Sequence, residues 1–151
     1  MIRRILCGLL ICAPLSLFAQ GSHSNTPPRL VAADLPRYPP IAEAAHITGW
    51  LKIQVTVEKG RVIGTKVLGA ETKARGQDSV STIGAPWLVS PTLENLKSWR
   101  FSSDVNGAFV VKFTYSFAGT ETDQPTNPTV EVLPSLDVNV IARPVKPVVE
   151  Y

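Results

Sequence analysis

Side chains suited to catalysis or metal binding are few in this chain of 151 residues, which contains two histidines. Neither His46 nor His23 has a second histidine or a cysteine close to it in the sequence, as a transition-metal site would require. A hydrolytic triad would have to join one of them to Ser79 or Ser81 and to Asp78, and no nucleophile elbow or triad spacing supports that combination. The sequence therefore predicts a protein that is not an enzyme, with no catalytic residue, no metal site and no cofactor. His46 is expected to be structural or solvent-facing.

The two cysteines, Cys7 and Cys12, lie in an N-terminal segment typical of a secretory signal. Arg3 and Arg4 precede an apolar run that ends in a small residue. We expect residues 1–19 to be a cleaved signal peptide. A retained inner-membrane anchor is the alternative, although the run is shorter than the roughly 18 apolar residues of a spanning helix. A cleaved chain contains no thiol, so packing alone must hold the fold.

The charge balance argues against a nucleic-acid partner. The signal carries two of the 15 basic residues, which leaves 13 against 12 acidic residues and a net charge of +1. Neither a basic run nor a basic stripe remains in the mature sequence. The chain is therefore not expected to bind nucleic acid.

The triplet Trp99-Arg100-Phe101 has two interpretations. Two large aromatic rings beside an arginine could stack on a ligand or a base, but stacking on nucleic acid also needs a basic groove. Leu93, Leu96 and Trp99 recur at helical spacing, which explains the tryptophan by packing alone. We therefore expect Trp99 and Phe101 to close the core, with Arg100 in water near the negative end of a helix.

The elements that must position these residues follow from periodicity. Pro39 and Pro40 can start a short helix that ends before Gly49. Residues 51–58 alternate apolar with polar side chains, which predicts a strand with one buried face, and Gly60 then turns the chain into a second strand. These signals predict a β-hairpin.

The second half of the domain is predicted in the same way. Residues 70–88 contain glycine and proline without a clear period and are expected to form a long loop. Ser90 is a suitable N-cap and Pro91 a suitable first residue for a helix over residues 91–99. Residues 109–117 alternate cleanly and form the strongest strand signal.

The predicted order is therefore helix, strand, strand, helix, strand, which indicates a small two-layer α+β domain with an antiparallel sheet and helices on one face. This domain covers residues 38–118 and follows a polar linker over residues 20–37. Residues 119–151 form a proline-bearing tail with the alternating pieces "TVEVL" and "LDVNVIA". Each piece is interpreted as an edge strand or as extended chain, and the second could pair with the domain's own edge and block it.

Three stretches together resemble the C-terminal domain of TonB, the periplasmic energy transducer of Gram-negative envelopes. They are "YPPIAEAAHITGWLKIQVTVEKGRVIGTKVLGA", "LKSWRF" and "AFVVKFTYSF", in the family's order. Each alone is a weak signal, and the combination is specific. The residues that carry the resemblance as a structural motif are Tyr38, Pro39, Gly49, Gly60, Trp99, Arg100 and Phe101.

The resemblance implies a TonB-C-like fold and a periplasmic binding module. In the family, an extended segment of an outer-membrane transporter, the TonB box, adds as a strand beside the last strand of the sheet. An exposed edge suits this role, because its free N–H and C=O groups bind an incoming strand. The positions implied for peptide binding are Leu35, Pro36, Arg37, Tyr38, Phe109, Val110, Val111, Lys112, Phe113, Thr114, Tyr115, Ser116 and Phe117.

The alternative is a structural or assembly module of the envelope that self-associates through the same edge, for example as a homodimer. Coupling to an inner-membrane motor, as in the family's transducers, stays open.

Overall fold

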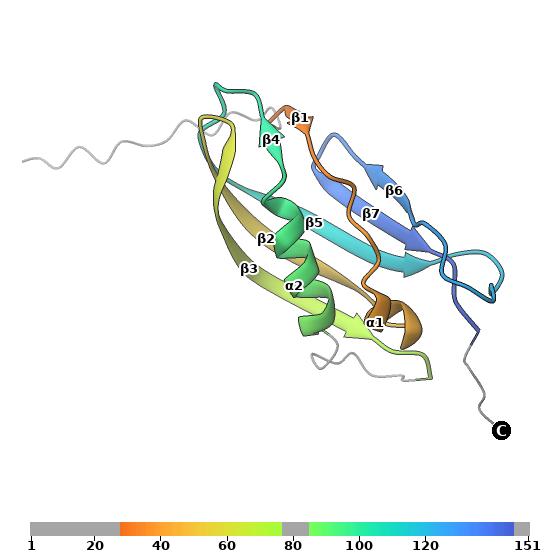
Figure 1. Cartoon of the computed structure of the whole chain (residues 1–151). Coiled ribbons are helices and arrows are strands. Elements are labelled where there is room, and N and C mark those ends of the chain that lie inside the picture. Colours follow the sequence, from red (N-terminus) through yellow and green to blue (C-terminus); the bar gives the residue numbers. More distant parts are fainter. Residues whose placement is uncertain (1–27, 77–84, 147–151) are drawn as a thin grey trace, which may run out of the picture.

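The computed structural model describes residues 28–76 and 85–146, which form a curled seven-stranded sheet with two helices against one face (Figure 1). The helices are α1 (Pro40–Ala44) and α2 (Ala85–Leu96). The strands lie in the order β1-β4-β3-β2-β5-β7-β6. Their bounds are β1 (Leu30–Ala32), β2 (Thr48–Glu58), β3 (Arg61–Lys73), β4 (Arg100–Phe101), β5 (Gly107–Phe117), β6 (Thr129–Val132) and β7 (Asp137–Ala142).

The predicted fold class, a small α+β domain of five elements with an antiparallel sheet, is wrong. The described chain is mostly strand: the segment expected to be a linker supplies β1, and the tail supplies β6 and β7. The sheet is also mixed, because β7 runs parallel to β5. The tail joins the sheet for a physical reason, since alternate tail side chains cover apolar surface beside β5 that would otherwise face water. These buried tail residues are Leu136, Val138, Val140 and Ala142.

The central hairpin forms where the sequence predicts it. Every second residue of β2 is buried, and β2 pairs with β3 across the turn at Lys59-Gly60. Both turn residues have positive φ, 49° and 75°, as a two-residue type I′ turn requires. Gly60 is also held from outside, because its N–H donates to the Val105 carbonyl at 3.0 Å and its carbonyl accepts from the Phe101 N–H at 2.8 Å.

The second helix begins earlier than predicted. Pro91 lies inside α2 rather than at its start, so Ser90 is a helical residue and not the N-cap. A proline at an interior position removes a backbone hydrogen bond and costs about 3 kcal/mol. Leu88, Thr92 and Leu96 are buried at intervals of four residues, and this stripe packs the helix against the sheet. Burial of the stripe offsets the cost of the proline.

The predicted loop over residues 70–88 is shorter than expected at both ends. β3 continues to Lys73, and α2 starts at Ala85. Residues 77–84 lie outside the described part of the chain, as do the predicted signal peptide and residues 20–27 of the predicted linker.

The packing interpretation of Trp99-Arg100-Phe101 is confirmed. Trp99 and Phe101 are 1% and 4% exposed, and the Trp99 Nε1–H donates to Asn95 Oδ1 at 3.0 Å. Arg100 is exposed, and its guanidinium donates to the carbonyls of Lys97 and Trp99, both at 2.8 Å, just beyond α2. The arginine therefore lies in water and ties the turn that follows α2, while its two aromatic neighbours close the core.

Replacing Gly60 with alanine is expected to lower the free energy of unfolding by about 2 to 4 kcal/mol, because strain at positive φ adds to overpacking. A Cβ at this position would lie 2.3 Å from the Phe101 carbonyl oxygen. Gly76 provides the matched control, with φ of 78° and open space around its Cβ position. Gly76→Ala should therefore cost only about 1 kcal/mol. Urea unfolding followed by tryptophan fluorescence measures both, and equal losses would contradict the close approach at Gly60.

Candidate functional site

The strand edge predicted to receive a peptide is occupied by the chain's own tail. One edge of β5 pairs with β2, and the other pairs in parallel with β7 from Lys112↔Asp137 to Phe117↔Ala142. β6 then pairs with β7 and ends the sheet. The hypothesis that "LDVNVIA" pairs with the domain's own edge is confirmed.

The predicted β5 residues divide between the two faces of the sheet. Val111, Phe113 and Tyr115 point into the core and are buried, while Phe109 and Phe117 are partly buried against it. The outward side chains are exposed or half-buried, and they are Val110, Lys112, Thr114 and Ser116. The register with β7 begins at Lys112, so residues 109–111 lie outside the parallel pairing.

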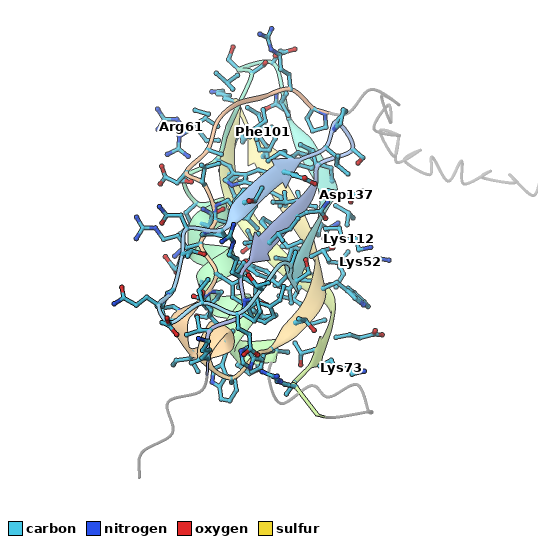
Figure 2. The ribbon with its side chains drawn as sticks, turned by 90° about the vertical axis from the view of Figure 1, so that its right-hand side faces the viewer. Lys52, Arg61, Lys73, Phe101, Lys112 and Asp137 are labelled. Atoms are coloured by element: carbon cyan, nitrogen blue, oxygen red, sulfur yellow. The ribbon has the colours of Figure 1, made fainter. Side chains whose placement is uncertain are left out.

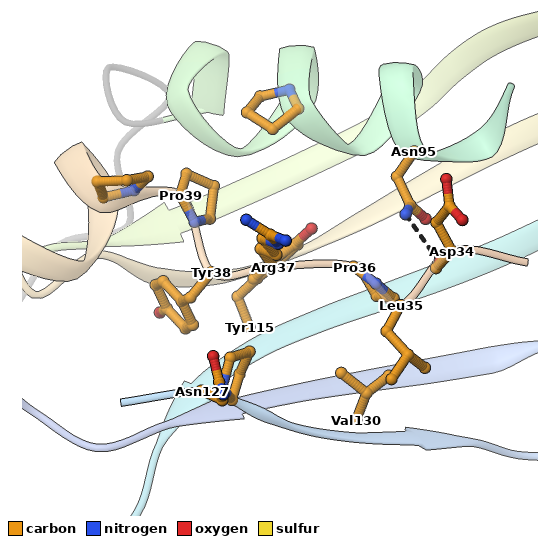
Figure 3. Close-up of a pocket in the computed structure, with 13 residues that line it drawn as sticks. Asp34, Leu35, Pro36, Arg37, Tyr38, Pro39, Asn95, Tyr115, Asn127 and Val130 are labelled. Carbon is orange, nitrogen blue, oxygen red and sulfur yellow. Dashed lines mark hydrogen bonds between the residues drawn. The ribbon is translucent and has the colours of Figure 1, made fainter. Parts of the chain in front are cut away.

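The other predicted site residues line an open groove of about 770 Å³ on the helix side of the sheet (Figure 3). Residues 34–40 cross this face in extended form between α2 and the tail strands. Within this segment Leu35 is 70% exposed, whereas Pro36 and Tyr38 are buried. Four predicted residues, Leu35, Pro36, Arg37 and Tyr38, therefore meet the predicted Tyr115 in one groove.

Sequence reasoning missed the part of the lining that comes from α2 and from the tail. Pro91 and Asn95 come from α2, while Asn127, Pro128 and Val130 come from the tail. The alternation of "TVEVL" indicated a strand near Val130, but no local signal tells which surface that strand approaches.

Two tyrosines build the floor of the groove. The Tyr38 hydroxyl donates to the Ile47 carbonyl at 2.5 Å, and its ring meets the Tyr115 ring edge-on with centroids 5.4 Å apart. The Tyr115 hydroxyl donates to Thr92 Oγ1 at 2.8 Å, because the Thr92 hydroxyl hydrogen is donated to the Leu88 carbonyl. Burial raises the pKa of Tyr115 to about 12 and also raises the pKa of Tyr38, so both stay protonated donors at neutral pH.

The extended segment is tied to the helix at its start. The Asn95 side-chain amide donates to the Asp34 carbonyl at 2.9 Å, and the Asp34 N–H donates to Ser98 Oγ at 3.0 Å. These two bonds hold the segment beside α2 and leave Leu35 facing the groove and Val130 of β6 (Figure 3).

His46 has a structural role at the far end of the tail. Its Nε2 lies 2.8 Å from the Val145 carbonyl oxygen and must donate to it, because a carbonyl only accepts. Its ring also meets Phe117 edge-on at 5.6 Å. Lys146 pairs with Asp123 at 2.8 Å, an exposed ion pair within the tail that water largely screens. The tail is thus fastened beyond β7 as well as along it.

Neither protein-family models nor curated protein sequences give a match to this chain. Within residues 28–76 and 85–146, no group of three or more histidine, cysteine, aspartate or glutamate side chains could hold a metal ion. The same ranges contain no helix long and apolar enough to cross a membrane. The other residues considered for a triad, His23, Asp78, Ser79 and Ser81, lie outside the described part of the chain.

Glu43 in α1 leads to a prediction about pH. Its side chain is 5% exposed, its Oε1 has no hydrogen-bond partner among the described residues, and burial raises its pKa. The folded state therefore holds the Glu43 proton more tightly than the unfolded state, so stability falls as pH rises through the folded-state pKa. Glu43→Gln should raise the free energy of unfolding at pH 7 and change it little near pH 4, in urea titrations at both values.

The matched control is Glu94→Gln, because Glu94 is an exposed glutamate paired only with Lys97. That substitution should change stability little at either pH. A Glu43→Gln variant that is less stable than wild type at pH 7 would contradict the account of an unsatisfied buried carboxylate.

Proposed function

We propose that this chain is a non-enzymatic periplasmic binding module that pairs by strand addition with extended segments of outer-membrane transporters. The observation that carries the proposal is the parallel pairing of β7 with β5, because it demonstrates that this edge accepts a six-residue extended strand. The class of partner and the periplasmic location rest on the TonB resemblance and the predicted signal. A role in TonB-dependent transport follows if a motor couples to the module.

β7 defines what an incoming strand must supply. Main-chain hydrogen bonds along the edge contribute about 0.5–1.5 kcal/mol each after exchange with water. Val138 and Val140 add core contacts, since both side chains are fully buried. Burying a valine is worth about 1.5–3 kcal/mol, so a partner that replaces β7 needs apolar residues at the same alternate positions.

The exchange is then a competition between two strands for one edge. The tail is part of the same chain and acts at a high effective concentration. Every partner's apparent affinity therefore equals its intrinsic affinity multiplied by the fraction of time that the edge is vacant. Partner binding is therefore sensitive to any change that loosens β7. The groove under Leu35 offers additional apolar contact to a partner that arrives from the β6 side.

The other strand edges of the described sheet are poorly suited to pairing. β1 has three residues, and β6 has four and is flanked by Pro128 and Pro134. β3 is longer, but its pairing with β2 skips Ile63 and Leu68, which marks two bulges. Short strands, flanking prolines and bulges all oppose edge-to-edge association. These features support β5 as the edge that exchanges strands.

The second candidate function is self-association by exchange of the same strand. A copy whose edge is vacated could accept β7 of another copy, giving a domain-swapped dimer without any new contact. The observation that favours this candidate is that the tail already fits the edge in register.

Val140→Ala tests the proposal, because it weakens the tail and leaves the edge of β5 intact. Removing two buried methyl groups costs about 2 kcal/mol, and every 1.4 kcal/mol is tenfold in an equilibrium constant. Isothermal titration of the exported chain with TonB-box peptides should therefore show roughly 25-fold tighter binding to the variant than to wild type. Amide shifts should appear at residues 112–117 of β5.

Val57→Ala is the matched control, since Val57 is a buried valine at the far end of β2, opposite Gly107. It should destabilise the fold and leave peptide affinity unchanged. Equal gains in both variants would contradict exchange at β5. Light scattering measures the second candidate directly: a dimer population that grows with protein concentration and is lowered by added peptide supports swapping.

A further inference from the structure

A row of three charged side chains crosses the outer face of the sheet, away from the helices. Lys52 of β2 lies directly opposite Lys112 of β5, and Lys112 lies opposite Asp137 of β7. Figure 2 shows all three on the same outer side of the sheet. The charged row thus runs across the edge where the tail joins the domain.

The two lysines carry an electrostatic cost that the domain does not relieve by itself. Like charges at directly opposed positions of an antiparallel pair repel each other. Among the described residues, neither ammonium lies within 4.0 Å of a carboxylate, and the Lys52 ammonium lies 5.6 Å from the centroid of the Trp50 ring. Without β7, the pair would stand at the open edge with no neighbouring negative charge in its row.

The tail places a negative charge in the same row at its first paired residue, opposite Lys112 but more than 4.0 Å from its ammonium. Asp137 begins β7, and its carboxylate is held by the Ser135 hydroxyl at 3.0 Å. The next residues alternate, with Val138, Val140 and Ala142 buried and Asn139 and Ile141 on the outer face. β7 therefore combines one acidic residue opposite Lys112 with small or branched apolar residues at the second, fourth and sixth positions.

We propose that the edge of β5 selects strands that place an acidic side chain opposite Lys112, and that β7 is the resident example of this pattern. The inference rests on the proposed function and adds a rule about its partner, an extended peptide whose first paired residue is acidic. Specificity arises from repulsion as well as attraction, because a basic residue at that position would set three cations in one row.

The test titrates the exported chain with peptides that have the sequence of residues 135–143. One peptide keeps aspartate at the position of Asp137, and two matched peptides carry asparagine or lysine there. The tail's own competition reduces all three affinities by the same factor, so their ratios report only the charge rule. At low ionic strength, titration should rank the aspartate peptide about 3 to 10-fold above asparagine, with lysine weakest, and 1 M salt should compress the ratios.

Two variants with the same change in charge separate the row from general attraction. Lys112→Glu should reverse the order, so that the lysine peptide binds tightest. Lys66→Glu alters an exposed lysine on β3, opposite Gln54 and away from β7, and should keep the original order.

Equal affinities for the three peptides, or equal effects of the two variants, overturn the charge rule and leave strand addition standing. Failure of every peptide to bind either wild type or Val140→Ala overturns the proposed function and the charge rule together.

Discussion

The structure is organised around β5, which pairs with β2 along one edge and with β7 along residues 112–117 of the other. Its inward side chains Val111, Phe113 and Tyr115 form the centre of the core, and an open edge there would leave backbone groups unpaired next to apolar surface. β2 pairs with the backbone groups of one edge, and β7 of the tail pairs with those of the other. The tail is therefore part of the fold and at the same time occupies the position that a partner strand would take.

The rest of the molecule is arranged around this second edge. Tyr38 covers the region where β5 ends, stacking on Phe117 with centroids 4.8 Å apart, and Tyr115 ties β5 to α2 through Thr92. His46 holds the chain just beyond β7 through Val145. The proposed strand exchange relies on an ordinary property of a sheet edge, and the proposed specificity relies on the side chains that line that edge.

The sequence predicted those features that local chemistry determines. The alternation of residues 51–58 gave the buried face of β2, Gly60 gave the hairpin turn, and the helical spacing before Trp99 gave the packing role of the aromatic triplet. It did not predict the fold class, because each of the two tail pieces was interpreted as an edge strand or as extended chain, and β1 lies in the segment that was expected to be a linker. The start of α2 was predicted wrongly for a related reason. Pro91 favours a helix start, but burial of the stripe from Leu88 to Leu96 places it inside the helix.

The candidate site was predicted in part. Residues 35–38 and Tyr115 were expected near each other and do share a groove, whereas Asn127 and Pro128 come from a segment whose position depends on the whole sheet. Long-range placement of this kind is decided by burial summed over many residues, which no short motif reports.

The central claim is that β7 leaves the edge of β5 without unfolding of the remaining sheet. Native-state amide hydrogen exchange measures this directly, because local opening and global unfolding give different free energies for different strands. The account predicts that amides of β7 and β6 exchange at least about tenfold faster than those of β2, which corresponds to an opening free energy lower by about 1.4 kcal/mol or more. Equal opening free energies in β7 and β2 would mean that the tail is released only by global unfolding, and would contradict strand exchange.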